Sequence, residues 1–126
     1  MKSINVALID DNRICRETFK MILKQVPGYN FTVLFEAESL VGIDRKSNQQ
    51  TSPDVILLDI MMPEIDGISG IPILNKLFPT THIVMLTDLD NPEMKQQCAD
   101  LGVNQYVIKS TAATKLAPTL INLFKD

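Results

Sequence analysis

The sequence predicts an α/β domain in which five parallel strands form a sheet that helices cover on both faces. Two observations predict this fold. Five short apolar runs have the length of buried strands, and the segments between them carry apolar residues at helical spacing. Strands that alternate with helices form a parallel sheet through right-handed crossovers. The chain has 126 residues, and we expect residues 1–126 to form one domain.

The first strand and the first helix follow each other directly. The apolar run of residues 4–9 stops at Asp10 and Asp11. Asp11 or Asn12 can accept hydrogen bonds from the first free N–H groups of the helix, and Pro27-Gly28 ends it. We expect the apolar positions of this helix to be core residues: Ile14 and Ile22 on one line with Thr18, and Cys15, Phe19 and Val26 beside it.

The second strand is predicted at residues 31–35. A weak helix is predicted from Glu38 to Lys46, although Gly42 lies within it and glycine disfavours a helix interior. Residues 47–53 should form a mobile polar loop.

The third strand, residues 54–59, contains an apolar run that ends on Asp59. The segment after it should be helical, because its apolar residues share one face. Gly70 and Pro72 lie inside that segment, and proline fits only the first turn of a helix, so we expect the helix to begin late or irregularly. The residues of the apolar face are Ile68, Ile71, Leu74 and Leu77.

Residues 82–87 form the fourth predicted strand. Asn91-Pro92 is a good start for the fourth helix, which Gly102 ends. A short fifth strand covers residues 105–108 and stops at Lys109. Leu116, Leu120, Leu123 and Phe124 mark the core side of the fifth helix, and Pro118 obscures its start.

Composition narrows the function classes. A net charge of −3 with mixed signs argues against direct binding of nucleic acid or of an anionic membrane by this domain. Cys15 and Cys98 are far apart and read as reduced core thiols. With one histidine a zinc site is not expected, and no stretch has the length of a signal peptide or a membrane span. We therefore expect a cytoplasmic protein.

Polar side chains gather at the carboxyl ends of the strands. If the strand order is the flavodoxin-like 2-1-3-4-5, the first and third strands are neighbours, and Asp10, Asp11 and Asp59 converge where the topology switches. Three close carboxylates need a compensating charge, and Mg²⁺ prefers such oxygen ligands. Lys109 can reach Asp59 or an anion bound to it, and Thr87 adds a hydroxyl. This set predicts phosphoryl transfer to Asp59 as nucleophile.

At these residues the chain resembles the receiver domain of two-component response regulators, over essentially its whole length. The resemblance implies that Asp59 accepts a phosphoryl group from a sensor histidine kinase, a phosphotransfer protein or a small phosphodonor. The domain would catalyse only its own phosphorylation and dephosphorylation and would not be an enzyme in the metabolic sense. The motif set comprises Asp10-Asp11, Asp59, Pro63, Gly67, Thr87 and Lys109.

The resemblance also implies the metal ligands. Asp11 and Asp59 would bind Mg²⁺ directly, Asp10 would act largely through water, and the backbone carbonyl of Met61 would be a further ligand. Lys109 would contact the phosphoryl group. No other cofactor is expected.

A switch is implied as well. Thr87 would move toward the phosphoryl group, and Tyr106 would turn inward with it. The responding surface would comprise the fourth helix, the fifth strand and the fifth helix, and it would bind an output domain, an effector protein or a second copy of the chain. Whether the chain stands alone or is the N-terminal part of a longer regulator stays open at this stage.

Several positions depart from the family pattern, among them Gly70 and Pro72 in the third predicted helix. Ser110 follows Lys109 where the family usually has a cis proline, and a cis bond before serine would cost about 3–4 kcal/mol, so either strain is stored or the loop differs. Asp88 follows Thr87 where a small residue is usual, which would repel an incoming phosphoryl group. An alternative is therefore a receiver-like interaction module that works without phosphorylation. A flavodoxin-type flavin or nucleotide carrier is a further alternative, but no glycine-rich phosphate loop follows the first strand.

Overall fold

The computed structural model describes residues 1–48 and 52–125. Its sheet has five parallel strands in the order β2-β1-β3-β4-β5, which confirms the flavodoxin-like doubly wound fold predicted from the sequence. β4 and β5 have the predicted ranges, β3 is one residue shorter at each end, and β1 and β2 are longer than predicted. The strands are β1 (Lys2–Ile9), β2 (Tyr29–Ala37), β3 (Val55–Leu58), β4 (His82–Thr87) and β5 (Gln105–Ile108).

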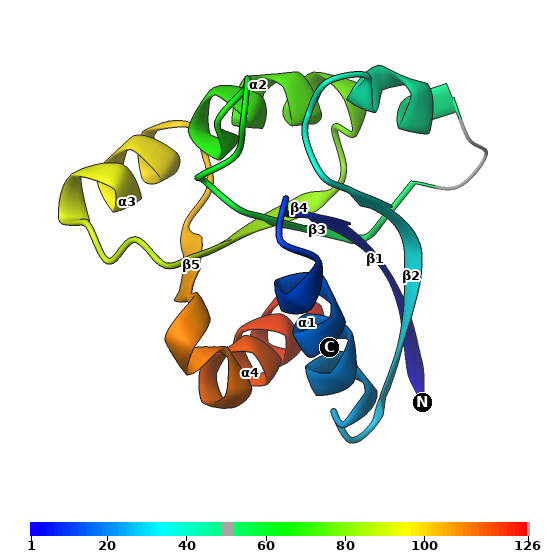
Figure 1. Cartoon of the computed structure of the whole chain (residues 1–126). Helices are drawn as coiled ribbons and strands as arrows, with labels where there is room; N and C mark the ends of the chain where they lie inside the picture. The colour runs from blue at the N-terminus through cyan, green and yellow to red at the C-terminus, as the bar shows by residue number, and fades with distance from the viewer. Residues whose placement is uncertain (49–51, 126) are drawn as a thin grey trace.

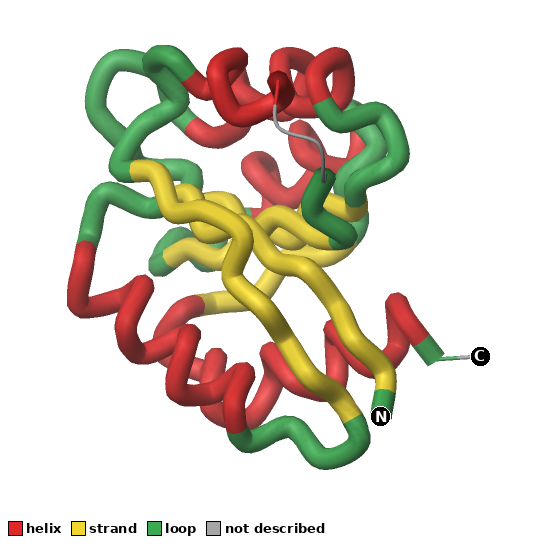
Figure 2. The backbone as a smooth tube through the Cα atoms, turned by 90° about the vertical axis from the view of Figure 1, so that its right-hand side faces the viewer, coloured by secondary structure: helices red, strands yellow, loops and turns green. Residues whose placement is uncertain are grey.

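Helices cover both faces of the sheet (Figures 1 and 2). In Figure 1, α2 (Gly67–Leu77) and α3 (Pro92–Asp100) lie above the sheet, and α1 (Arg13–Lys24) and α4 (Ala112–Phe124) lie below it. Each face has its own apolar core, because successive side chains of a strand point to opposite faces. On β3, for example, Ile56 and Leu58 belong to the upper core, and Val55 and Leu57 to the lower one.

α1 begins where the sequence indicates, but its buried face is rotated from the predicted one. The side chain of Asn12 caps the helix by accepting a hydrogen bond from the Cys15 N–H. Phe19 and Leu23 face the lower core, whereas Ile14 is 77% exposed. The prediction that Ile14 is a core residue was therefore wrong. The helix aligns its longer apolar stripe with the sheet, and Ile14 lies outside that stripe.

The helix predicted from Glu38 to Lys46 is wrong. A loop occupies the first half of this segment, and the only regular structure is the 3₁₀ helix η1 (Ile43–Asn48). Gly42 has a φ of +76°, which an α-helix cannot contain. Leu40 and Ile43 are buried in the upper core and anchor the segment instead. Part of the predicted polar loop, residues 49–51, lies outside the described residues.

The helix after β3 begins promptly, which corrects the expectation of a late or irregular start. Asp66 caps α2, because its Oδ1 accepts a hydrogen bond from the Ser69 N–H at 2.9 Å. Pro72 lies inside the helix. A Cβ on Gly70 would lie 2.2 Å from Leu40 Cδ1, so a larger residue here would require the end of the Leu40 side chain to move. The glycine that weakens the sequence signal therefore lets α2 approach the 38–42 loop.

The C-terminal part follows the prediction closely. Asn91 caps α3, and its side chain accepts hydrogen bonds from two backbone N–H groups of the first turn. Gly102 follows the helix with a φ of +90°, a conformation that glycine adopts easily. Within residues 1–48 and 52–125, the structure has four α-helices rather than the five predicted. None of the described helices is long and apolar enough to cross a membrane.

The loop after β5 resolves the question that Ser110 raised. Residues Lys109–Thr111 form a 3₁₀ turn, η2, that leads into α4. The described peptide bonds are all trans, including the one between Lys109 and Ser110. Of the two alternatives predicted for this position, the loop therefore differs. Pro118 lies within α4, and Leu116 and Leu120 are fully buried as expected.

Candidate functional site

Three carboxylates meet at the carboxyl ends of β1 and β3, as the sequence predicts. Asp10 and Asp11 follow β1, and Asp59 follows β3. One oxygen from each side chain lies within 4.8 Å of the others. Asp10 and Asp59 are almost completely buried, at 3% and 5% exposure, whereas Asp11 is exposed. The cluster is therefore a half-open acidic site with two buried oxygen donors and one at the surface.

Lys109 spans the two buried acids. Its Nζ lies 2.8 Å from Asp10 Oδ2 and 3.1 Å from Asp59 Oδ2. The sequence predicted the contact with Asp59 and did not predict the one with Asp10. Burial opposes the charge of Lys109, but the two carboxylates outweigh it and raise the pKa of Lys109. Lys109 is therefore a fixed cation at the floor of the site.

Burial raises the pKa of Asp59, and the attraction to Lys109 offsets this only in part because Asp10 repels the same charge. The carboxylate of Asp59 is thus held in an environment that disfavours its charge. Binding of a cation, or a reaction that consumes the charge, would lower the free-energy cost of burying this carboxylate. A buried acid with a perturbed pKa beside a lysine is typical of a functional site.

The backbone around Asp59 is fixed on both sides. The Asp59 N–H donates to the Ile9 carbonyl at 3.0 Å, and the Gly67 N–H donates to the Ile60 carbonyl at 2.8 Å. A Cβ on Gly67 would lie 2.0 Å from the Asp59 carbonyl oxygen, so only glycine allows this approach. This contact explains why a glycine eight residues after Asp59 belongs to the site.

The donors present fit a hard divalent cation. Asp10 Oδ2 is buried and makes its ion pair with Lys109 but no hydrogen bond of good geometry, so it retains the capacity to accept from a metal-bound water. Carboxylate oxygens and waters are the ligands that Mg²⁺ prefers. Asp10, Asp11 and Asp59 would hold such an ion. The Met61 carbonyl, two residues after Asp59, remains a predicted ligand.

The two predicted switch residues are connected through the backbone of Leu89. Thr87 is fully buried, and its Oγ1 accepts a hydrogen bond from the Leu89 N–H at 3.3 Å. The Tyr106 hydroxyl donates to the Leu89 carbonyl at 2.5 Å. Lys95 Nζ lies 5.5 Å from the centre of the Tyr106 ring. A movement of Thr87 would therefore displace the backbone of Leu89, whose carbonyl accepts the hydrogen bond from Tyr106.

Two of the residues that depart from the family pattern lie at the rim. Asp88 is exposed, so its carboxylate is solvated rather than directed into the buried part of the site. Ser110 is also exposed, in the turn that begins at Lys109. Neither residue takes the place of one of the acids or of Lys109.

Arg16 and Glu36 were missed at the sequence level. Arg16 lies three residues before Phe19 and seven before Leu23, on the face of α1 that packs against the sheet, and it is only 7% exposed. Glu36 lies near the carboxyl end of β2. An arginine at the spacing of the buried apolar residues was the available signal, because arginine is rarely buried without partners.

The fold and this site define a doubly wound α/β domain with an acidic cluster at the topological switch point. The sequence model of the response regulator receiver domain matches residues 6–120, and the chain belongs to that family. The resemblance inferred from the motifs is thus confirmed.

Known relatives agree with this assignment. Two-component response regulator ARR22 of Arabidopsis thaliana is 32% identical over 124 residues, which are 98% of this chain and 85% of the relative. The uncharacterized transcriptional regulatory protein YxjL of Bacillus subtilis is 33% identical, over 90% of this chain and 50% of its own length. This chain therefore spans about half of some of its relatives.

A solved structure gives the same result for the fold. The isolated REC domain of RcsB from Salmonella enterica serovar Typhimurium, in the presence of the phosphomimetic BeF3⁻, superposes with a TM-score of 0.85 at 28% identity. The match covers 98% of this chain and 90% of the other.

Proposed function

We propose that this domain is a phosphorylation-dependent signalling switch in which Asp59 accepts the phosphoryl group. One observation carries the proposal: Lys109 bridges Asp10 and Asp59 at a cluster of three acids, 2.8 and 3.1 Å from their oxygens. The arrangement supplies a nucleophile, oxygen donors for a cation and a fixed positive charge. All three are what transfer of a phosphoryl group to a carboxylate needs.

In the proposed reaction an oxygen of Asp59 attacks the phosphorus atom of a phosphohistidine. A new O–P bond forms, the P–N bond breaks, and its electron pair leaves with the imidazole of the donor. The product is an acyl phosphate on Asp59. Bound Mg²⁺ would supply positive charge to the transferring oxygens. Asp10 and Asp11 hold the cation site, and Lys109 would exchange its contact with Asp59 for one with the phosphoryl oxygens.

The proposed switch runs from Thr87 to the surface. A phosphoryl group on Asp59 offers acceptors for the Thr87 hydroxyl and the Lys109 ammonium, which favours one conformation of the site. The hydrogen bonds that join Thr87 and Tyr106 to Leu89 would carry the change outward. The responding surface in this structure comprises α3, β5 and α4, which correspond to the predicted fourth helix, fifth strand and fifth helix.

The proposal includes partners. A sensor histidine kinase or a phosphotransfer protein would donate the phosphoryl group in the cytoplasm. The output surface would bind an output domain, an effector protein or a second copy of the chain. Several relatives are about twice as long and are named transcriptional regulators, so a DNA-binding output domain is the partner that they suggest. The receiver itself would make no nucleic acid contact, and it would catalyse only its own phosphorylation and dephosphorylation.

Incubation with acetyl phosphate tests the proposal. We expect the intact mass to increase by one phosphoryl group in Mg²⁺ and to stay unchanged in EDTA or in Asp59→Asn. Asp88→Asn, an exposed acid at the rim, is the matched control and should still be phosphorylated. If wild type and Asp59→Asn both remain unmodified with acetyl phosphate and with a phosphorylated histidine donor, the domain is a phosphorylation-independent interaction module.

A further inference from the structure

The side chain of Arg16 reaches from α1 to the acid pair that follows β1. Its Nη1 donates to the backbone carbonyl of Asp10 at 2.6 Å. The arginine is only 7% exposed, so this charged hydrogen bond is formed away from most of the solvent. Burying a guanidinium costs free energy unless its N–H groups are hydrogen-bonded. The bond to the Asp10 carbonyl is therefore maintained and holds that carbonyl in one orientation.

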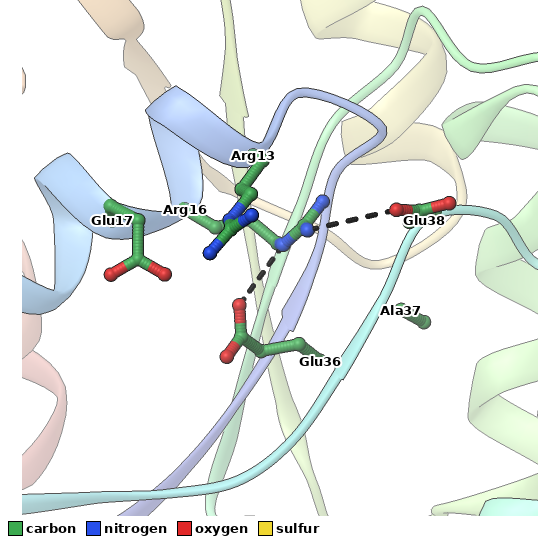
Figure 3. A pocket seen from close by; sticks show the side chains of 6 residues that line it. All are labelled: Arg13, Arg16, Glu17, Glu36, Ala37 and Glu38. Atoms are coloured by element: carbon green, nitrogen blue, oxygen red, sulfur yellow. Dashed lines mark hydrogen bonds and ion pairs between the residues drawn. The ribbon is translucent and has the colours of Figure 1, made fainter.

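The other side of the guanidinium is fixed to β2 (Figure 3). Nε donates to Glu36 Oε1 at 3.0 Å, and Nη2 lies 3.9 Å from Glu38 Oε1. Lys20 binds the second oxygen of Glu36 at 2.6 Å. These contacts lower the pKa of Glu36, with the hydrogen bond from Lys20 as the largest cause, so Glu36 stays charged. Arg16 therefore links the carboxyl end of β2 to the segment Asp10-Asp11.

Asp10 is fixed at each of its other polar groups. Its N–H donates to the Ala37 carbonyl at 3.0 Å, and its Oδ1 accepts from the Asn12 N–H at 2.8 Å. Together with the bond from Arg16, these contacts leave Oδ2 directed at Lys109 and the acid cluster. Arg16 fixes the peptide that joins Asp10 to Asp11, and thereby the direction in which both side chains leave the backbone.

We propose that Arg16 is a positioning residue for the cation site, acting through the Asp10 carbonyl. The proposal rests on the proposed function, since it concerns the Mg²⁺ that Asp10, Asp11 and Asp59 would hold. Arg16 does not contact the reacting groups. Because Glu36 holds Arg16 in place, β2 would also influence the affinity of the site for its cation.

If Arg16 acted only through its charge, its removal would change the Mg²⁺ affinity in the opposite direction. Arg16 is a positive charge close to the cation site, so its removal should strengthen Mg²⁺ binding if it acts only as a charge. Arg13 lies one turn earlier on the same helix, is exposed, and lines an open surface pocket together with Arg16 and Glu36. Arg13→Met removes the same charge without touching the Asp10 carbonyl, and is the matched control.

The experiment measures Mg²⁺ affinity by isothermal titration calorimetry for wild type, Arg13→Met, Arg16→Met and Arg16→Lys. Loss of a residue that orients a metal ligand typically weakens binding by 10–100-fold, so we expect Arg16→Met to bind roughly tenfold more weakly. Arg16→Lys keeps the charge but lacks the planar fork that serves Glu36 and Asp10 together, so it should also bind more weakly. Arg13→Met should bind as wild type does, or slightly more tightly.

Urea unfolding in EDTA accompanies each titration, so that affinities are compared only among folded variants. Arg16→Lys is the milder change and keeps the test valid if Arg16→Met does not fold. Wild-type binding with both Arg16 variants matching Arg13→Met would overturn this inference alone and leave the proposed function standing. A wild-type chain that binds no Mg²⁺ would overturn the metal part of the proposed function and this inference with it.

Discussion

Asp59→Asn should stabilise the folded domain in the absence of divalent cations. Oxygens of Asp10 and Asp11 lie within 4.8 Å of one from Asp59, and each such pair of charges repels by about 3.5 kcal/mol at an effective dielectric constant of about 20. The Lys109 ammonium, 3.1 Å away, attracts Asp59 by about 5 kcal/mol on the same basis. Burial opposes the charge of Asp59 most strongly, and burial and repulsion together exceed the attraction by Lys109. Asparagine removes the charge and keeps nearly the same shape.

The expected gain is about 1 kcal/mol, because the exposure of Asp11 screens part of its repulsion. With a urea m-value of about 1.5 kcal/mol per M, the unfolding midpoint of Asp59→Asn in EDTA should rise by about 0.7 M. Asp44→Asn, an exposed acid outside the cluster, controls for net charge and should leave the midpoint nearly unchanged. A midpoint of Asp59→Asn below that of wild type would refute the reasoning, since the lysine attraction would then dominate.

Two further conditions follow from the same site. Free Mg²⁺ at ten times its dissociation constant should stabilise wild type by about 1.4 kcal/mol and Asp59→Asn by less. The difference in unfolding midpoint between the two proteins should then disappear or change sign. Low pH should remove this difference as well. The pKa of Asp59 is raised on folding, so protonation below that pKa favours the native state, and the cost of the charge appears only as the pH rises through it. The unfolding midpoints of the two proteins should therefore converge as the pH falls below the raised pKa of Asp59 toward the ordinary range of an aspartate.

Three other perturbations have defined outcomes. Lys109→Gln leaves two buried carboxylates without their cation and should cost about 3 kcal/mol of unfolding free energy in EDTA, measured by urea unfolding. Asp66→Ala removes the cap of α2 and should cost about 1 kcal/mol at pH 7; because hydrogen bonding lowers the pKa of Asp66, this difference should fade as the pH drops through that pKa. Gly67→Ala should destabilise the domain far more than Gly70→Ala. A Cβ at position 67 would clash with the backbone of Asp59, whereas a Cβ at position 70 would meet the flexible end of the Leu40 side chain. A lower melting temperature for Gly70→Ala than for Gly67→Ala would contradict this.

The strand order and the acid cluster were predictable because both depend on local signals. An apolar run that ends on an acid, as residues 55–59 do, places the acid at the carboxyl end of a buried strand whatever the rest of the chain does. Five strands that alternate with helices place their carboxyl ends at one edge, and Asp10, Asp11 and Asp59 meet there because β1 and β3 are neighbours in the order that the sequence analysis assumed. The positions of Thr87 and Lys109 follow from the same argument.

The errors arose where a distant contact decides the local structure. The segment after Glu38 has helical composition, but Leu40 packs against Gly70, thirty residues later, and the loop adopts the shape that this contact requires. Pro72 seemed to forbid a regular helix, yet the cap from Asp66 and the burial of the apolar face hold α2 together. Sequence spacing contains neither contact.

The role of Arg16 was hidden for a related reason. Its partners, the Asp10 carbonyl and Glu36, lie at the carboxyl ends of two neighbouring strands, and a hydrogen bond to a backbone carbonyl cannot be read from the sequence. Only the pairing of β1 with β2 brings them together. Burial of a charged residue becomes interpretable once those neighbours are known.

The central claim is that a phosphoryl group on Asp59 changes the surface formed by α3, β5 and α4. Backbone amide NMR spectra during titration with Mg²⁺ and then beryllofluoride, for wild type and Asp59→Asn, test it most directly. We expect changes at Asp11, Asp59 and Lys109 that extend through Leu89 to Tyr106 and α3, and that are absent in the variant. Changes confined to the acid cluster, or identical spectra with and without beryllofluoride, would contradict the account.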